Sequence, residues 1–397
     1  MKARTILNEL LADVTRRMHK VRRASLGAVV TSLISGASLS VTSLGRNIES
    51  KTTEKPQIKR STRLLSNPHL HRELSGIYSK LCHRLVGSRK QPVILVDWSD
   101  LDPRKQHFLL RASVAVEGRS LTLLEEIHPL SQKEKPGVHR RFMHRLKQSL
   151  PATCRPVIVT DAGFRAPWFR LVQSLGWDYV GRVRNKTFCK SETDEEWHPV
   201  KELYRQASAT AKSLGAYQLC RREPMDCHMV VYKRKSKGRK DLTANGERSR
   251  NSKLSRANAA REKEPWLLAT SLTPSTSKFA KRVTRIYQTR MQIEESFRDL
   301  KTGLDFSVGN TRKQKRLDVL LLIALLAQFV LYLVGVAVKS AGMHRRYQAN
   351  TVKDSNVLSY QFLGLRAIKD CYLKLRKRHL EDAACRIQQS ISAHSHA

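Results

Sequence analysis

Hydrophobic and polar positions begin to follow a β-type pattern near residue 92. Pro92–Asp97 is apolar up to its last residue, which is typical of a strand buried on both faces. Two alternating runs follow around a Glu-Gly-Arg sequence, which predicts a hairpin. The full predicted order is strands at Pro92–Asp97, His107–Val116 and Ser120–Ile127, a helix at Pro136–Leu150, a strand at Pro156–Thr160, a helix at Pro167–Leu175 and a strand at Trp177–Val183. The sequence therefore predicts an α/β fold built on a mixed sheet.

The first 88 residues lack this β pattern and instead predict basic helices. Leu39–Asn47 reads as half of a helix-turn-helix motif, with Gly45 punctuating it. Ile58–Leu65 reads as a second short amphipathic helix. Its polar side chains would act as donors to DNA phosphates: Lys59, Arg60, Ser61, Thr62 and Arg63. A plain helical bundle with a basic surface is the alternative.

A β-rich and basic stretch, residues 185–265, interrupts the second half of the chain. Strands are predicted at His228–Arg234 and Trp266–Leu272. Between them, a basic run at Lys233–Lys240 and a polar stretch predict a flexible arm or loop, which either only solubilises the chain or binds DNA by counterion release. We therefore predict a helical domain at 1–88, a core at 89–342 with 185–265 inserted in it, and a helical C-terminal region at 343–397.

One apolar segment, Val319–Val338, has the length of a membrane span. The alternative is a core helix buried on all sides. We favour the buried helix, because the chain offers no second span to pair with it.

The charge of the chain narrows the class of partner. The 397 residues carry a formal net charge of +40, which favours a polyanion such as DNA, RNA or an anionic membrane surface. Seven cysteines without a CxxC pair indicate a reducing compartment and argue against both a disulfide framework and a zinc ribbon. Cys220, Cys227 and His228 could be drawn as metal ligands, but we favour no metal there. The first residues contain no apolar core of signal-peptide type.

The segment Tyr287–Lys301 carries the most specific chemistry. It reads as one helix in which Tyr287, Arg290, Glu294 and Lys301 fall within about 60° of one another, since each residue turns a helix by about 100°. An apolar stripe lies beside them and can be buried: Ile286, Ile293, Phe297, Leu300 and Leu304. The flank with Tyr287, Arg290, Glu294 and Lys301 combines a carboxylate with a phenol, a guanidinium and an ammonium. Such a set can bind a metal ion and phosphates. An ordinary solvated helix face is the alternative.

Two upstream aspartates end apolar strands. Asp97 follows Val-Ile-Leu-Val, and Asp161 follows Val-Ile-Val-Thr. A carboxylate at such a position is expensive to desolvate unless a cation or a donor compensates it. Each aspartate could simply cap the turn or helix that follows. Together with Glu294, however, they supply three hard oxygen ligands, which can hold one or two Mg²⁺ ions for phosphoryl transfer.

These residues resemble a known family of enzymes. Asp97, Asp161 and Glu294 resemble the DDE triad of cut-and-paste transposases with a ribonuclease-H-like core, and the predicted order of strands and helices is the one that this core requires. The spacing Tyr-x2-Arg-x3-Glu-x6-Lys is similar to the YREK signature of the insertion sequence four family. Several segments further resemble its insertion sequence ten branch: VLVDWSD, LLRASVAVEGRSLTL, TDAGF, GRVR, YKRKSKGRK, EPWLLAT and RMQIEESFRDLK. The resemblance extends from about Leu39 to about Leu358.

The resemblance implies two-metal phosphoryl transfer on DNA. The three carboxylates would coordinate two Mg²⁺ ions, for which Mn²⁺ can substitute, while Tyr287, Arg290 and Lys301 would hold phosphates near the cleaved end. The same site would nick the element end, form a hairpin, reopen it and join the end to target DNA. The resemblance also favours recognition of DNA ends by residues 1–88.

Hairpin formation requires a base to leave the stack, and an apolar or aromatic pocket must receive it. Trp266, 28 residues before Glu294, matches the base-flipping tryptophan of the family in type and placement. Packing in the core of a strand is the alternative for this residue. Arg182 and Arg184 would clamp the DNA backbone at a strand end.

The remaining expectations also follow from the resemblance. The partners would be double-stranded DNA at the element ends and the target, and a second copy of the chain in a synaptic complex, with no membrane involved. The protein would act in the bacterial cytoplasm, on the nucleoid. The loop after Lys301 is shorter than in the relatives that the chain resembles, which could alter the geometry. The alternatives are a catalytically inactive DNA-binding relative and a basic membrane protein spanned by Val319–Val338.

Overall fold

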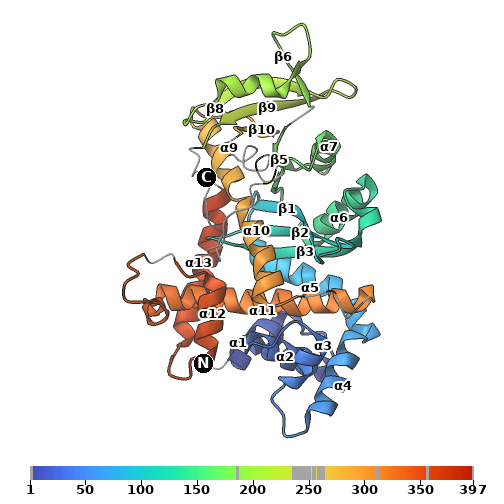
Figure 1. The fold of residues 1–397 in the computed structure, drawn as a ribbon, viewed down its shortest axis with the longest axis vertical. Helices are drawn as coiled ribbons and strands as arrows, with labels where there is room; N and C mark the ends of the chain where they lie inside the picture. The colour runs from blue at the N-terminus through green and yellow to red at the C-terminus, as the bar shows by residue number, and fades with distance from the viewer. Residues whose placement is uncertain are drawn as a thin grey trace. The chain divides into compact units, whose positions relative to one another are not determined.

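The computed structural model of the protein describes residues 3–184, 187–234, 252, 256, 264–306, 308, 311, 313–354 and 357–395. Figure 1 shows their helices and strands. By their contacts these residues fall into two compact units. Unit 1 combines Met1–Pro156 with Met291–His396, and unit 2 consists mainly of Val157–Arg290. Both units contain helices and strands, so the predicted α/β class is confirmed.

Unit 1 begins with five helices, as predicted for the first 88 residues. Ser40 and Asn67 cap the third and fifth helices with their side chains. Gly45, which was predicted to punctuate the motif, is the next-to-last residue of the third helix, where a Cβ would lie 2.5 Å from the Cα of Ile58 in the fourth. The five helices are α1 (Ala3–Val14), α2 (Lys20–Ile34), α3 (Val41–Arg46), α4 (Glu54–Leu65) and α5 (Pro68–Val86).

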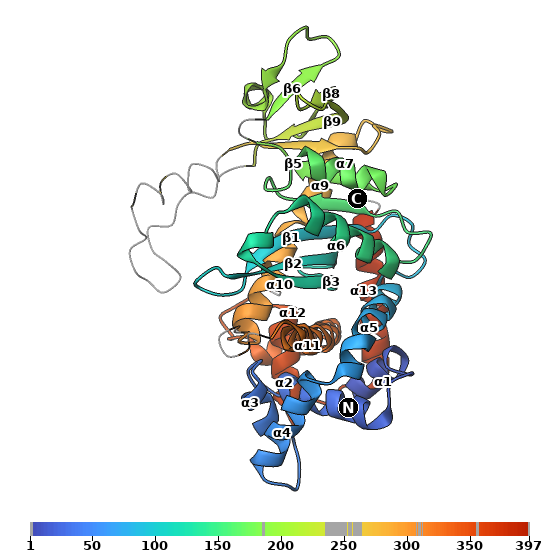
Figure 2. The same ribbon diagram turned by 90° about the vertical axis from the view of Figure 1, so that its right-hand side faces the viewer.

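Three antiparallel strands follow in the order β3-β2-β1. Gly118, with φ +68°, forms the predicted hairpin turn between the second and third strands. In Figure 2, α10 lies on one side of these strands, and α6 and α13 lie on the other. The elements here are β1 (Val93–Asp100), β2 (His107–Ala115), β3 (Ser120–Pro129), the short 3₁₀ helix η1 (Leu130–Gln132) and α6 (Pro136–Ser149). They match the predicted β-β-β-α order.

The prediction of one continuous helix from Tyr287 to Lys301 was wrong. Helix α9 (Phe279–Gln288) ends in unit 2, and α10 (Met291–Arg298) starts in unit 1, followed by a π-helix, η3 (Asp299–Gly303). Thr289 makes the break, because both its backbone N–H and its hydroxyl donate to the carbonyl of Ile286, at 3.2 and 2.7 Å. These bonds close the last turn of α9 and divide the predicted flank between the two units.

The apolar segment Val319–Val338 lies within one long helix, α11 (Gln314–Ser340). Among the described residues, α11 is the one helix long and apolar enough to cross a bilayer, and its most apolar window is wholly buried within the protein. Helices α2 and α5, strand β3, and the C-terminal helices α12 (Tyr360–Lys369) and α13 (Lys377–Ser395) all pack against it (Figure 1). The structure therefore supports the buried-helix interpretation. A short 3₁₀ helix, η4 (Met343–Tyr347), precedes α12.

Two glycines allow α12 to cross α11 at close range. A Cβ on Gly335 would lie 1.8 Å from the carbonyl oxygen of Tyr360, and a Cβ on Gly364 would lie 2.0 Å from that of Leu331. Both opposing atoms belong to the backbone, so rotation of a side chain cannot relieve the clash.

We expect Gly364→Ala to lower the free energy of unfolding by about 1–3 kcal/mol, because it forces the two helix backbones apart. A matched control is Gly76→Ala in α5, where a Cβ meets nothing within 4 Å. The control should be neutral or more stable by up to about 1 kcal/mol, since alanine favours a helix. Thermal unfolding followed by circular dichroism would compare them. A Gly364→Ala protein as stable as the control would contradict the close crossing.

Unit 2 carries the remaining strands, in the order β4-β5-β10-β9-β8-β6-β7, with β4 and β5 parallel and the other pairs antiparallel. The predicted strand, helix and strand after residue 156 are confirmed. The basic run that begins at Lys233 lies outside the described residues from residue 235 onward. The elements are β4 (Val157–Thr160), α7 (Ala166–Ser174), β5 (Asp178–Arg182), β6 (Phe188–Ser191), β7 (His198–Pro199), η2 (Val200–Gln206), β8 (Lys212–Leu219), β9 (Met225–Tyr232) and β10 (Trp266–Thr270).

Strand β9 contains two of the three residues that could be drawn as metal ligands from the sequence, Cys227 and His228. Cys227 and His228 are consecutive in β9, so their side chains point to opposite faces of the sheet. They cannot both bind one ion from that strand without distorting it.

Candidate active site

Asp97 lies within β1, because the strand continues to Asp100 and does not end at Asp97 as predicted. Asp97 is only 9% exposed. Its Oδ1 accepts a hydrogen bond from the backbone N–H of Trp98 at 2.8 Å. Across the ladder it lies directly opposite Arg111 of β2, which in turn lies opposite Glu125 of β3. Directly opposed residues share one face of a sheet, so these three side chains form a charged row on one face.

That row faces the helix that carries Glu294. The fully buried Arg111 donates from Nη1 to Ser296 Oγ at 2.8 Å, and its guanidinium lies 5.0 Å from the centre of the Phe297 ring. Both residues belong to α10. Glu294 lies within about 60° of Phe297 around the helix. Strand β1 with Asp97 and helix α10 with Glu294 are therefore in contact, on the same face of the sheet.

Arg111 is itself held by Glu125, whose Oε2 accepts from Arg111 Nε and Nη2 at 2.9 and 2.7 Å. Tyr78 of α5 donates to the other carboxylate oxygen at 3.3 Å, and burial raises the pKa of Tyr78 well above its ordinary value. Arg111 was not among the site residues predicted from the sequence. The available signal was an arginine in the middle of an otherwise apolar strand, which is rarely buried without a partner.

Trp98 points to the opposite face of β1 from Asp97, since strand residues alternate. Its indole Nε1 donates to Nε2 of His139 in α6 at 3.1 Å. Burial lowers the pKa of His139 to about 4, so the ring is neutral at pH 7 and can accept this bond. Helix α6 thereby fixes the residue that follows Asp97.

A pH-dependent loss of stability follows from His139. Because its pKa is lowered in the folded state, the unfolded chain takes up the proton first as the pH falls. The contribution is complete above about pH 6.5 and is lost between about pH 6.5 and 4. We expect His139→Gln, which keeps an acceptor for Trp98 but cannot titrate, to lose less stability over that range. Urea denaturation at a series of pH values would measure the difference, and parallel curves for the two proteins would contradict it.

Asp161 follows β4 in unit 2 and is half-buried. Its Oδ1 accepts from the backbone N–H of Gly163 at 2.9 Å, so it does cap the following turn. Capping occupies only part of a carboxylate, which has about four acceptor positions, so this bond leaves room for a metal ion.

Lys301 lies in the π-helix η3 of unit 1. Its ammonium donates to Ser99 Oγ at 3.1 Å and to the carbonyl and Oδ1 of Asp100 at 3.3 and 3.2 Å. Ser99 lies two residues beyond Asp97, on the same face of β1 and about 7 Å farther along the strand. The structure therefore brings Lys301 to the end of the strand that carries Asp97.

The other two residues of the predicted flank belong to unit 2. Tyr287 is 3% exposed, and its ring packs edge-on against Trp266 with 4.9 Å between centroids. The ring of Tyr232 also packs against Trp266, with 5.7 Å between the two centroids. Arg290 follows the end of α9 and is half-buried. Trp266 is itself half-buried, so its ring belongs to an aromatic cluster that still has exposed surface.

The two arginines predicted to clamp DNA share a carboxylate that the sequence analysis missed. Glu264 Oε2 accepts from Arg184 Nε and Nη2 at 2.9 and 2.5 Å and lies 3.9 Å from Arg182 Nη2. Burial lowers the pKa of Arg182. DNA phosphates would have to compete with Glu264 for these arginines.

The three predicted metal ligands are carboxylates, but they are not gathered around one point. Among the residues that the structure describes, no group of three or more His, Cys, Asp or Glu side chains lies close enough together to hold a metal ion. Asp97 and Glu294 belong to unit 1 and Asp161 to unit 2. The donor chemistry fits, because all three are hard oxygen ligands of the kind that Mg²⁺ prefers.

Comparison with known proteins agrees with this reading of the fold. A search of curated proteins finds no match. A scan against protein families, by contrast, matches residues 88–330 to the transposase DDE domain. The matched region is more than half of the chain and contains Asp97, Asp161 and Glu294. The chain therefore belongs to the transposase DDE domain family, with its α/β, ribonuclease-H-like core.

Proposed function

We propose that the protein is the transposase of an insertion sequence, of the insertion sequence four family and its insertion sequence ten branch, and that it moves this element by cut and paste. The observation that carries the proposal is that β1, with Asp97, and α10, with Glu294, are in contact. Arg111, opposite Asp97 in β2, donates to Ser296 of α10 and so ties this helix to the same sheet. Asp161, which follows β4, would be the third ligand of the triad.

Asp97, Asp161 and Glu294 would bind two Mg²⁺ ions or, in their place, Mn²⁺. Such ions would activate a water or a DNA 3′-OH and stabilise the leaving oxygen. The protein itself positions the strand and balances charge, which are the larger part of catalysis in phosphoryl transfer. Arg290 and Lys301 would hold the phosphates near the scissile bond. Tyr287, being buried, would act mainly by supporting Trp266.

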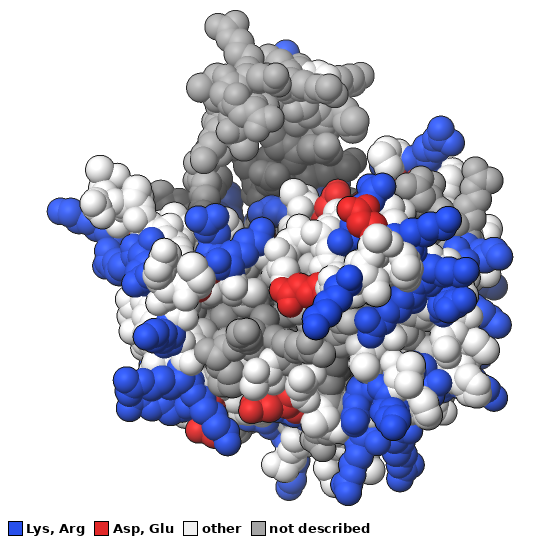
Figure 3. All heavy atoms as spheres, turned by 90° about the horizontal axis from the view of Figure 1, so that it is seen from below, with Lys and Arg blue, Asp and Glu red and all other residues white. Residues whose placement is uncertain are grey.

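The N-terminal helices would recognise the terminal repeats of the element. Lys59 and Arg63 of α4 are exposed as predicted, whereas Ser61 is fully buried and Thr62 donates to the carbonyl of Ile58, so neither hydroxyl serves as a phosphate donor as predicted. Figure 3, which views the end of unit 1 where α3 and α4 lie in Figure 1, shows many more basic than acidic side chains. Exposed basic residues of this region include Lys20, Arg23, Lys51, Lys55, Lys59 and Arg63.

Trp266 would receive the base that leaves the stack when the hairpin forms, with Tyr232 and Tyr287 supporting its ring. We expect Trp266→Ala to spare the first nick and to reduce hairpin formation by about 10-fold or more, since a stacked base contributes about 1–3 kcal/mol. Denaturing gels that resolve nicked and hairpin products would measure both steps. An equal loss at both steps would instead indicate a packing role.

The partners would be double-stranded DNA at the element ends and at the target, and a second copy of the chain in the synaptic complex. The helical region at 343–397 would contribute contacts between subunits. The protein would work in the cytoplasm, on the nucleoid, without a membrane.

The decisive experiment is cleavage of a DNA fragment that carries the gene with its native flanks. Purified protein with Mg²⁺ should produce flush double-strand ends through transient hairpins, and Glu294→Gln should bind the same DNA without cutting it. The second candidate is an inactive DNA-binding relative, which the high positive charge alone would also fit. Tight, salt-sensitive binding without cleavage by the wild type, in either Mg²⁺ or Mn²⁺, would establish that candidate instead.

A further inference from the structure

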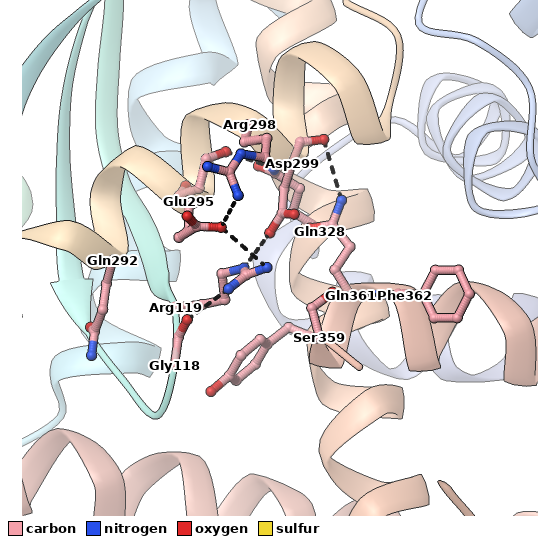
Figure 4. A network of polar contacts seen from close by, with 12 residues as sticks. Gly118, Arg119, Gln292, Glu295, Arg298, Asp299, Gln328, Ser359, Gln361 and Phe362 are labelled. Carbon is pink, nitrogen blue, oxygen red and sulfur yellow. Dashed lines mark hydrogen bonds and ion pairs between the residues drawn. The ribbon is translucent and has the colours of Figure 1, made fainter. Parts of the chain in front are cut away.

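The π-helix η3, which carries Lys301, is fixed by a polar network within unit 1 (Figure 4). Arg119, at the turn between β2 and β3, donates from Nε to Asp299 Oδ2 at 2.7 Å and from Nη1 to the carbonyl of Gly118 at 2.9 Å. Its Nη2 lies 3.7 Å from Glu295. The side chains of Arg119 and Asp299 are only 18% and 15% exposed, so this pair is partly shielded from solvent.

A second contact holds the same residue from the C-terminal region. Gln361 of α12, itself 8% exposed, donates to the backbone carbonyl of Asp299 at 3.4 Å. Gly303 completes the fit, because a Cβ there would approach the amide nitrogen of Gln361 to 3.3 Å. Asp299 is therefore held through its carboxylate by the β2–β3 hairpin and through its carbonyl by α12.

This network acts on an unusual backbone. A π-helix closes i→i+5 hydrogen bonds, is rare, and is found mostly as single turns at functional sites. It turns less per residue than an α-helix, so it changes the direction of every side chain within and after it. In this protein the π-helix begins at Asp299, two residues before Lys301. The Lys301 ammonium then reaches Ser99 on the face of β1 that carries Asp97.

Removal of the Arg119 guanidinium would leave the Asp299 carboxylate without the cation that is hydrogen-bonded to it. Burial raises the pKa of the Asp299 carboxyl, while Arg119 acts in the opposite direction. A shielded carboxylate that loses its partner is strongly disfavoured, so the turn would rearrange to expose it. Such a rearrangement would move Lys301, which lies in the same turn.

We propose that Arg119 and Asp299 are positioning residues, which hold η3 in its π-helical form so that the Lys301 ammonium lies at the end of β1 to receive a DNA phosphate. The role of Lys301 in binding a DNA phosphate rests on the proposed function. The placement of Lys301 by Arg119 and Asp299 does not, so it can be tested separately.

The first test measures the reactivity of Lys301 in the full-length protein, by limited acylation of amines and mass spectrometry. In the wild type the ammonium has three acceptors and should react slowly. Arg119→Ala and Asp299→Asn should each raise the rate at Lys301 severalfold, and Arg119→Lys should have a smaller effect. The matched control is Arg298→Ala, since Arg298 pairs with Glu295 in the same network but is 67% exposed. Unchanged reactivity of Lys301 in both Arg119→Ala and Asp299→Asn would overturn the proposal.

The second test uses cleavage, with a double-mutant cycle that a purely structural role would not satisfy. Arg119→Ala and Lys301→Ala should each slow strand cleavage by about 10- to 100-fold without weakening DNA binding to the same extent. Adding Arg119→Ala to Lys301→Ala should have little further effect, because Arg119 acts through Lys301. Independent, multiplying losses would refute the coupling. If the wild type cuts no DNA, the proposed function fails, and the acylation test still decides whether Arg119 positions Lys301.

Discussion

Glu125→Ala should lower the free energy of unfolding by about 3–5 kcal/mol, because it leaves the Arg111 charge buried without its partner. Both side chains are almost wholly inaccessible, at 0% and 1% exposure, so water cannot replace the lost carboxylate. The same change also removes the acceptor of the Tyr78 hydroxyl. Urea denaturation followed by circular dichroism would measure the loss.

Two comparisons make this result specific to the buried pair. Glu381→Ala removes a carboxylate from an exposed i,i+4 pair with Lys377, and it should change stability by no more than about 0.5 kcal/mol. The double variant Arg111→Met with Glu125→Leu should recover most of the stability, since apolar side chains of similar size can replace a buried ion pair. A Glu125→Ala protein as stable as the Glu381→Ala control would show that Arg111 finds another partner or is solvated.

That double variant would also separate stability from function. It restores a packed core but cannot donate to Ser296, so α10 would lose one of its ties to the sheet. We expect it to fold and yet cleave DNA more slowly than the wild type. Slower cleavage by a stably folded double variant would show that Arg111 serves to hold α10, which carries Glu294, against the sheet.

The spacing of apolar and polar residues, together with the glycine at the hairpin turn, predicted the regular elements well. The predicted hairpin between His107–Val116 and Ser120–Ile127 is present with the same turn, because alternation of apolar residues and a glycine at positive φ are local properties. Burial of the stripe from Ile286 to Leu304 was also predicted correctly. These features need no knowledge of distant contacts.

The break between α9 and α10, within the predicted helix, could not be predicted from such local sequence features. Thr289 and Arg290 are both acceptable in a helix, and only the hydrogen bonds of Thr289 to Ile286, together with the change of unit at residue 291, end it there. The ion pair of Arg184 with Glu264 joins residues 80 positions apart, and Arg119 meets Asp299 across 180. Such pairs are set by tertiary packing, so single-sequence patterns do not contain them.

The largest effects on activity should come from the three carboxylates. Asp97→Ala, Asp161→Ala and Glu294→Ala should each reduce the rate of first-strand nicking by at least about 1000-fold, since each would remove a proposed metal ligand, and a factor of 1000 corresponds to about 4 kcal/mol of transition-state stabilisation. Asp161 is the most informative of the three, because it belongs to unit 2 while the other two belong to unit 1. Comparable losses for all three would support the assignment of Asp161 as a ligand together with Asp97 and Glu294.

Folding and binding must be measured alongside the rates. Each variant should keep a melting temperature close to that of the wild type and should still bind element ends, because binding depends on basic residues elsewhere. Asp100→Ala is a matched control, since Asp100 lies three residues beyond Asp97 in β1 but was not predicted as a ligand. It should lower the rate less, by loosening Lys301. Near-wild-type nicking by Asp161→Ala, with Asp97→Ala and Glu294→Ala inactive, would mean that the third ligand is another carboxylate and that the strand-end aspartate of unit 2 serves only as the cap of its turn.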